Sequence, residues 1–333
     1  MHATTLSSAA LMIWKTLKQD YGLNADQLFL DCELDPRQVS NPGHRYPDEK
    51  ILKLWETAFE HTGDECFGLK VAMHIHPTTL HALGFAWLSS PNLLDALQRL
   101  VRFYRIVTDA EKLELESAEH VYVLKLVPLS HLIEVSPMDY DTFFAALLIM
   151  CQAICGTEYR PAYIKMQRPE PACLAEMNSF FQVPIEFNQV ENEIGFYKTS
   201  ILDPLPAANA LLARENDQIM MRFLSQLDKN DVVMQVKSIL TNKLPAGDIN
   251  EKDIADALHI STRTLQRKLN EQQKSFKEII DETRRELAIQ YVREVDVPMT
   301  EITFLLGYSE QANFTRAFKR WTGQSPSEFR KAS

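Results

Sequence analysis

A nine-residue pattern that occurs twice in the last third of the chain constrains its fold more than any other feature. The first copy reads DIADALHIS at residues 253–261, and the second reads EITFLLGYS at residues 301–309, 48 positions later. In each copy an acidic residue precedes Ile, a Leu closes a short helix, and a turn leads to a Ser that is suited to cap a second helix. The repeat predicts two helix-turn-helix units, at about residues 251–272 and 299–322.

The second helix of each unit has one apolar face and one polar face. Leu265 and Leu269 in the first unit, and Phe314 and Phe318 in the second, are spaced i, i+4 and predict a buried face. Polar and basic residues fall on the opposite face. A chain that builds this unit twice is expected to read DNA.

Turn signals support both units. Gly307 stands where the second turn requires a positive φ, and His259, which tolerates this conformation better than most residues, has the same place in the first unit. Gly323 is expected to end the second recognition helix. A helical pattern at residues 276–293 separates the units and predicts a rod of about 27 Å. Such a rod would hold two recognition helices about one DNA turn apart, roughly 34 Å.

The charge of the chain is unevenly distributed. The net charge is −10 over 333 residues, a length that predicts about two domains. Residues 229–333 hold 17 Lys and Arg against 15 Asp and Glu, a net charge of +2, so the first 228 residues carry −12. A near-neutral C-terminal domain is compatible with DNA binding if its basic residues share one face.

Composition indicates a cytoplasmic protein that does not span a membrane. The N-terminus lacks the basic region of a signal peptide, and the longest apolar run, residues 143–151, is shorter than the ~20 residues of a membrane helix. The five cysteines are an odd number and are expected to be reduced thiols rather than a disulfide framework.

The first two-thirds of the chain mixes helical and extended patterns, which predicts an α+β domain. Helices are expected at residues 47–61, from Ser90-Pro91 to about 107, from Ser136-Pro137 to 154, and at 174–181. Strands are expected at residues 113–116 and 121–127, which form a hairpin, and at 163–166 and 185–187. The breaker Asp203-Pro204-Leu205-Pro206 suggests three parts: a regulatory domain (1–206), a helical connector (207–228) and a DNA-binding domain (229–333).

Other residue groups in this region have ordinary structural interpretations. His74, His76 and His81 are a weak metal signal, because no Cys or carboxylate partner accompanies them, so no metal is expected. Cys151 and Cys155 are more consistent with core thiols than with a redox pair. Arg99, Arg102 and Arg105 fall on one side of a predicted helix. There they either form a solvated face or contact an anionic effector. No nucleophile elbow, phosphate loop or zinc-protease motif is present in residues 1–210, so an enzyme is not expected.

Residues 232–330 resemble the AraC/XylS family of bacterial transcription regulators along the full DNA-binding domain. The resemblance rests on ITFLLGY at residues 302–308 and FTRAFKRWTGQSP at residues 314–326, where Thr303 replaces the small Ala usual in the family. It implies an all-α, seven-helix domain whose recognition helices enter successive major grooves of double-stranded DNA.

That resemblance, with the polar faces, gives the expected DNA-binding residues. Base contacts are expected from Arg263, Gln266 and Arg267 in the first unit and from Gln311, Asn313, Thr315 and Arg316 in the second. Phosphate contacts are expected from Lys268, Lys319 and Arg320. Which Arg contacts a base and which a phosphate stays open.

The front domain is similar to the sensor domain of one branch of that family, which includes regulators of amino-acid use and of virulence. The residues that carry the similarity are FGLK at 67–70, LGFA at 83–86 and SSPNL at 89–93. It implies an unidentified small-molecule effector, without making arabinose that ligand, and an activator that contacts RNA polymerase and acts as a homodimer. The alternative is a front domain that binds a protein partner or only dimerises, without a ligand.

Overall fold

The predicted hairpin forms one edge of a five-stranded sheet in the N-terminal part of the chain. Strands β3 (Glu111–Ser117) and β4 (Val121–Pro128) pair antiparallel, as the alternation of their side chains predicts. Leu124 lies beside Ile194, which in turn lies beside Ile164, and all three are buried on one face of the sheet. A computed structural model provides this structure and describes residues 3–129, 135–227, 231–247, 249–293 and 297–332.

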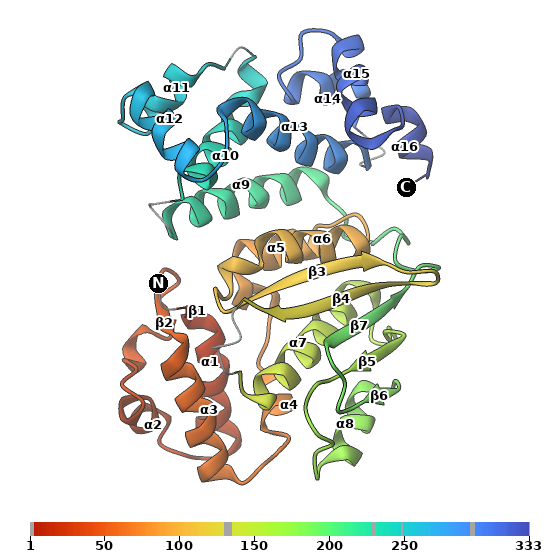
Figure 1. Ribbon diagram of the computed structural model, residues 1–333. Coiled ribbons are helices and arrows are strands. Elements are labelled where there is room, and N and C mark those ends of the chain that lie inside the picture. Colours follow the sequence, from red (N-terminus) through yellow and green to blue (C-terminus); the bar gives the residue numbers. More distant parts are fainter. Residues whose placement is uncertain (1–2, 130–134, 228–230, 248, 294–296, 333) are drawn as a thin grey trace. The chain divides into compact units, whose positions relative to one another are not determined.

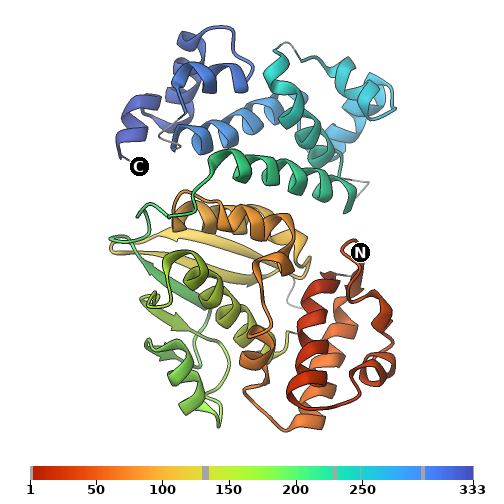
Figure 2. The same ribbon diagram turned by 180° about the vertical axis from the view of Figure 1, so that it is seen from behind.

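The opposite face of the sheet carries ion pairs. Lys125 bonds to Glu116 and Glu191 at 3.2 and 3.0 Å, and Lys165 bonds to Glu193 at 2.8 Å. The strand order is β3-β4-β7-β5-β6, where β5 is Tyr163–Lys165, β6 is Ile185–Glu186 and β7 is Asn192–Tyr197, and only the β5–β6 pair is parallel among the described strands. Helices α6 (Leu93–Phe103) and α7 (Pro137–Cys155) lie together on one face of the sheet (Figure 2). This is the face of the buried leucine and isoleucines, opposite the ion pairs, and it holds the core.

The N-terminal part also contains further helices and a small second sheet (Figure 1). Their bounds, in chain order, are β1 (Thr4–Leu6), α1 (Ser7–Lys15), α2 (Ala25–Asp31), β2 (Arg45–Pro47), α3 (Asp48–Thr62), α4 (Phe67–Ala72), α5 (Ala82–Leu88), α6 (Leu93–Phe103), α7 (Pro137–Cys155), β5 (Tyr163–Lys165), α8 (Leu174–Phe181), β6 (Ile185–Glu186) and β7 (Asn192–Tyr197). Strands β1 and β2 pair antiparallel.

The C-terminal part is helical throughout its described residues. Its helices are α9 (Ala210–Leu227), α10 (Val232–Lys243), α11 (Glu251–Ala257), α12 (Thr262–Glu271), α13 (Phe276–Arg293), α14 (Met299–Leu305), α15 (Gln311–Thr322) and α16 (Pro326–Ala332). The chain divides into two compact units, Met1–Asn216 and Asp217–Ser333. The expected combination of a mixed α/β domain and a helical domain is confirmed. Lys229, the predicted first residue of the DNA-binding domain, lies outside the described residues.

The predicted start of α6 is wrong by two residues. The N-cap is Asn92, whose side chain accepts a hydrogen bond from the Asp95 backbone N–H at 2.9 Å, and not Ser90. Ser90 is fully buried and donates to the Ala86 carbonyl, so its hydroxyl ends the preceding helix instead. Arg99 is also not on a solvated face, because it is only 4% exposed, forms an ion pair with Asp95 and donates to the Ser90 hydroxyl.

The expectation of five reduced thiols is contradicted. Cys66 and Cys173 form a disulfide that joins positions 107 residues apart, with a Cα–Cα distance of 6.0 Å. Pairing over such a separation cannot be deduced from spacing in the sequence. Cys32, Cys151 and Cys155 are free thiols, and burial raises the pKa of Cys155 to about 11.

Helix α7 is the one described helix that is long and apolar enough to cross a membrane by length and composition. Its side chains are largely buried within the N-terminal unit, including Phe144, Leu148 and Cys151. The core helix of a globular domain passes the same test, so this helix is weak evidence for a membrane span.

Candidate DNA-binding interface

Helices α11 and α12 form the first helix-turn-helix unit. His259 adopts a φ of 56°, and the Ile260 backbone N–H then donates to the Ala255 carbonyl at 3.0 Å, which closes the turn. The Ser261 hydroxyl accepts a hydrogen bond from the Thr264 backbone N–H at 3.1 Å and caps α12, as predicted. The predicted positive φ at His259 is confirmed.

The second unit repeats this turn 48 residues later. Gly307 has a φ of 72°, and the Tyr308 backbone N–H donates to the Thr303 carbonyl at 3.0 Å. A Cβ atom on Gly307 would lie 2.5 Å from the Leu244 carbonyl oxygen. Glycine is therefore required here by a close approach as well as by the backbone angle, whereas the first turn accommodates His259.

The two recognition helices are offset by 49 residues rather than 48, because the second turn is one residue longer. Helix α12 begins at Thr262 and α15 begins at Gln311, with Glu310 as its N-cap. The expectation that Ser309 caps the second helix is therefore wrong. The extra residue explains why Phe314 and Phe318 correspond to Leu265 and Leu269 at a spacing of 49.

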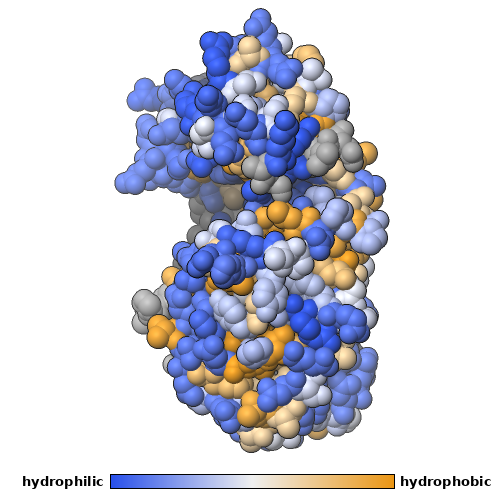
Figure 3. All heavy atoms as spheres, turned by 90° about the vertical axis from the view of Figure 1, so that its right-hand side faces the viewer, coloured by the Kyte–Doolittle hydropathy of each residue, from blue (hydrophilic) through white to orange (hydrophobic). Residues whose placement is uncertain are grey.

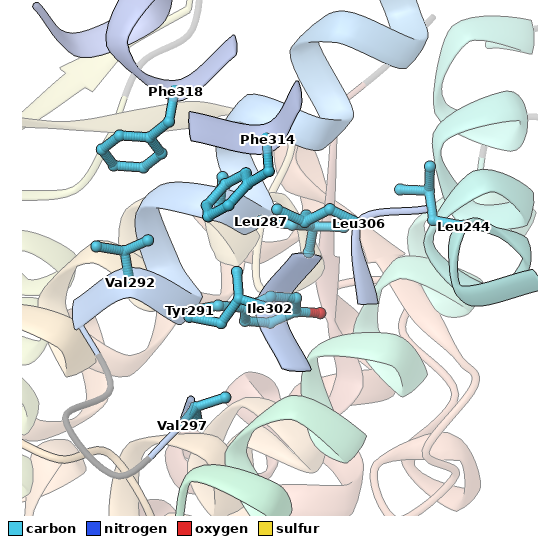
Figure 4. Close-up of a cluster of buried hydrophobic side chains, with 10 residues drawn as sticks. Leu244, Leu287, Tyr291, Val292, Val297, Ile302, Leu306, Phe314 and Phe318 are labelled. Carbon is cyan, nitrogen blue, oxygen red and sulfur yellow. The ribbon is translucent and has the colours of Figure 1, made fainter. Parts of the chain in front are cut away.

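Both apolar pairs are buried in separate hydrophobic clusters. Leu265 and Leu269 are 0% and 1% exposed and pack with residues of α10 and α13. Phe314 and Phe318 are fully buried with residues of α13 and α14, and Figure 4 shows them in the same cluster as Leu287. Because α13 contributes to both clusters, it supports the two recognition helices from one rod.

The ten residues predicted to contact DNA all lie on α12 or α15. The exposed ones are Arg263, Gln266, Arg267, Gln311, Arg316, Lys319 and Arg320, and the half-buried ones are Lys268, Asn313 and Thr315. Figure 3 shows the C-terminal unit from the side on which α15 and α16 lie in Figure 1, and this face is predominantly hydrophilic.

Several of these side chains bond to neighbouring residues. Gln266 Nε2 donates to Glu251 Oε2 at 2.6 Å, and Arg316 Nη2 donates to Asn313 Oδ1 at 2.6 Å. Arg267 pairs with Glu271 one turn along α12. An exposed pair at this spacing contributes only about 0.3–0.5 kcal/mol, whereas a bidentate base contact contributes about 1–3 kcal/mol of discrimination. The local ion pair is therefore weaker than a base contact would be.

Arg320 and Arg284 connect the second unit to α13. Arg320 Nη2 bonds to Asp281 Oδ1 at 2.7 Å, and Trp321 Nε1 donates to Asp281 Oδ2 at 2.9 Å. Arg284 donates to the Leu306 carbonyl at 3.0 Å. Sequence reasoning did not single out Asp281 or Arg284, because both act through contacts at least 22 residues away along the chain.

A hollow of about 510 Å³ lies between α13 and α15. Its lining includes four cationic side chains, those of Lys277, Arg284, Arg316 and Arg320, and one anionic side chain, that of Asp281. The charge balance of this surface suits an anion such as a backbone phosphate. From the sequence, Lys277 could be placed near the start of the predicted helix at residues 276–293, but it could not be assigned to this surface.

The histidines considered for a metal site differ in their partners, and His81 Nε2 is buried without a hydrogen-bond partner among the described residues. His74 Nε2 lies 2.8 Å from Asp20 Oδ2, and His81 has a φ of 51° at the N-terminus of α5. Within the described ranges of the chain, no group of three or more His, Cys, Asp or Glu side chains is arranged to hold a metal ion.

Two helix-turn-helix units that follow a mixed α/β domain define the class of this protein, a DNA-binding transcriptional regulator. Residues 22–205 match the family model of the arabinose-binding domain of AraC transcription regulator, and residues 254–332 match a helix-turn-helix domain model. The first match alone covers more than half of the chain. The chain belongs to the AraC family of transcription regulators.

Two regulators of similar sequence agree with this assignment. The ornithine utilization regulator of Pseudomonas aeruginosa is 27% identical over 318 residues, which are 95% of this chain and 93% of that protein. VirS of Mycobacterium tuberculosis is 33% identical over 119 residues, 35% of each chain. The solved structure of CdpR from P. aeruginosa is 16% identical with a TM-score of 0.46, covering 92% of this chain and 96% of that one. The relatives are transcriptional regulators and not enzymes.

Proposed function

We propose that this regulator reads its DNA site by inserting α12 and α15 into successive major grooves on one face of the duplex. The observation that carries the proposal is the recurrence of one scaffold. Both turns are closed by equivalent 3.0 Å backbone bonds, and both second helices bury an apolar pair and leave a polar face exposed. The 18-residue helix α13 would separate the two recognition helices by about 27 Å, close to one helical repeat of DNA.

The positions of the side chains support a division of roles. Residues early in a recognition helix contact base edges, which suits Arg263 on α12 and Gln311 and Asn313 on α15. Lys319 and Arg320 lie in the last turn of α15 and are better placed for phosphate contacts. The remaining assignments are base contacts from Gln266, Arg267, Thr315 and Arg316 and a phosphate contact from Lys268.

The N-terminal unit is proposed to sense a small-molecule effector, with residues 207–228 as the connector and 229–333 as the DNA-binding domain. The family model that it matches is named for a ligand-binding domain, which supports sensing but does not identify the ligand. Ligand binding would favour one sensor conformation and so change the dimerisation or orientation of the DNA-binding domain. We further propose a cytoplasmic activator that contacts RNA polymerase and acts as a homodimer.

The second candidate is a regulator whose front domain binds a protein partner or only dimerises. A metabolite screen on the full-length protein distinguishes these two candidate functions. A saturable rise in the unfolding temperature with one metabolite class supports sensing, and silence across the screen together with intact DNA binding supports the partner model.

The DNA proposal is tested by measuring affinity for the upstream region of its own gene against scrambled DNA across a salt series. We expect selective binding with a slope of log K against log [salt] near −0.9 per phosphate neutralised. Alanine at Arg267 or Arg316 should reduce selectivity, with Lys252→Ala, an exposed residue outside α12 and α15, as the control. Equal binding of the parent and both arginine variants to every DNA would overturn the assignment of the reading faces.

A further inference from the structure

A small internal cavity in the N-terminal unit is lined by three carboxyl groups from three different elements. Asp48 is the first residue of α3, Glu111 the first residue of β3, and Asp139 lies in the first turn of α7. The cavity has a volume of about 80 Å³. We define the acidic cavity by these three side chains together with Trp55 and Tyr104, which also line it.

The acidic cavity contains polar atoms that have no hydrogen-bond partner among the described residues. They are Asp48 Oδ2, Glu111 Oε1 and Trp55 Nε1. Glu111 is 7% exposed and Trp55 is 2% exposed, so water does not readily compensate either group. Unpaired buried polar atoms are costly and few in native proteins, and the two carboxylate oxygens call for a donor that the described residues do not supply.

Arg45, whose charge acts on Asp48, is already bonded to other groups. Arg45 donates to the Thr4 hydroxyl at 2.8 Å, to the Thr4 carbonyl at 2.6 Å and to Asp109 at 3.2 Å. Its charge lowers the pKa of Asp48, but by less than burial raises it. The cavity therefore retains an excess of acidic groups.

Burial raises the pKa values of all three carboxyl groups, and repulsion from a neighbouring carboxylate adds to it in each case. Burial is the largest cause in each case, and it raises the pKa of Asp139 to about 7, with the Asp48 charge adding to it. The pKa of Glu111 is raised well above its usual range by burial and then by Asp139 and Asp48, and that of Asp48 is raised as well. A bound cation would reverse this balance by stabilising the charged carboxylates.

A cation bound in the acidic cavity would be organic rather than metallic. No group of three or more metal-ligating side chains in the described residues is close enough to hold a metal ion. An ammonium group instead presents several N–H donors to spaced acceptors, and the rings of Trp55 and Tyr104 provide aromatic walls of the kind that attract cations.

A larger hollow next to the acidic cavity leaves room for the rest of a ligand. It measures about 830 Å³ and shares Leu52 and Ser136 with the cavity. Leu52, Phe59 and Met138 contribute apolar surface to it. Its charged lining is mostly acidic, with Glu56, Glu60, Glu65 and Glu170 against Arg168, which already pairs with buried Asp141.

We propose that the acidic cavity is the binding site for the ammonium group of a small aliphatic amine, whose chain extends into the larger hollow. This inference rests on the proposed sensing function and names the chemical class of its effector. The amine would supply the partners that Glu111 and Asp48 lack, and the apolar residues of the hollow would contact the alkyl chain.

Calorimetric titration of the full-length protein at pH 8 with n-butylamine, 1,4-diaminobutane and n-butanol tests the proposal. We expect both amines to bind saturably and n-butanol, of similar size but uncharged, not to bind. Glu111→Gln should weaken amine binding about 10-fold or more, because a hydrogen bond to a charged group contributes about 1.5–3 kcal/mol. Asp48→Asn should weaken it similarly. Glu119→Gln, at an exposed residue in the β3–β4 turn, should leave it unchanged.

The outcomes separate this inference from the proposed function. If neither amine binds but another class of metabolite shifts DNA binding, the sensing function stands and the amine site is wrong. Amine binding that is unaffected in both Glu111→Gln and Asp48→Asn, with both variants folded by circular dichroism, would also overturn the site. If no metabolite of any class binds while DNA binding persists, the sensing function itself fails.

Discussion

The guanidinium group of Arg284 on α13 lies over the ring of Tyr308, 4.7 Å from its centroid, while donating hydrogen bonds to the carbonyls of Leu306 and Gly307 at 3.0 and 3.4 Å. One side chain thus holds both the backbone and the aromatic ring of the second turn. Because the turn sets the direction of α15, Arg284 couples α13 to the proposed second recognition helix.

Replacement of Arg284 by Ala is expected to impair DNA binding through the second unit by loosening the turn before α15. It removes two charged hydrogen bonds and a cation–π contact, so we expect a loss of about 1–3 kcal/mol in unfolding free energy. Urea unfolding measures the loss, with Arg285→Ala on the same helix as the control. Wild-type stability and wild-type DNA affinity in Arg284→Ala would contradict this role.

Gly307→Ala should destabilise the C-terminal unit more than Gly323→Ala does. Both glycines have a positive φ, of 72° and 79°, which costs an L-residue about 1–2 kcal/mol. Only at Gly307 would the new Cβ collide with a backbone oxygen, that of Leu244, whereas nothing lies within 4 Å at Gly323. Thermal unfolding of the two variants side by side gives the comparison, and equal losses would show that the close approach is unimportant.

Reduction of the Cys66–Cys173 disulfide should lower the stability of the N-terminal unit. The bond closes a loop of 107 residues, and disulfides contribute about 2–4 kcal/mol mainly by restricting the unfolded chain. We expect Cys66→Ser to lower the unfolding temperature and to make the protein insensitive to dithiothreitol. Thiol titration of the denatured, unreduced wild type should find three thiols, and finding five would refute the bond.

The stability of the N-terminal unit should fall as the pH rises from about 4 to about 7, because Asp139 binds its proton more tightly in the folded state. Its pKa is raised from 3.8 to about 7 by burial and by Asp48, so the unfolded chain releases this proton at a lower pH than the native protein does. Glu111, whose pKa is also raised, acts in the same direction. So does Asp48, whose pKa is raised despite the charge of Arg45.

Asp139→Asn removes one of these titrating carboxyl groups and, with it, that group's share of the pH dependence. The unfolding temperature of the variant relative to wild type should therefore increase between pH 5 and pH 8. Asp26→Asn, at an exposed residue in α2, serves as the control. A difference between Asp139→Asn and wild type that is constant with pH would show that Asp139 titrates normally.

Local sequence patterns predicted the helices whose formation is determined by residues close together in the chain. The helices at residues 174–181 and 276–293 have the predicted bounds, since their apolar periodicity agrees with their burial. Strand β7 was missed because its short segment is buried on both faces and shows no alternation. Its Gly195 lies so close to the Tyr163 ring that a Cβ would come within 2.5 Å, a constraint visible only in the fold.

Features of the candidate sites that depend on tertiary contacts were not predictable. The apolar pair and the turn geometry predicted α12 and α15, but the one-residue insertion that makes Glu310 the N-cap was not recognised. Arg284 acts on a turn 22 residues away, and the acidic cavity combines residues from positions 48, 111 and 139. Neither arrangement leaves a local signal in the sequence.

Hydroxyl-radical and methylation-interference footprinting would show whether α12 and α15 occupy successive major grooves. We expect two contact patches on one face of the duplex, with centres about 10–10.5 base pairs apart. Arg267→Ala should weaken one patch and Arg316→Ala the other. A single patch, or equal weakening of both patches by either variant, would show that the two helices do not bind in successive grooves.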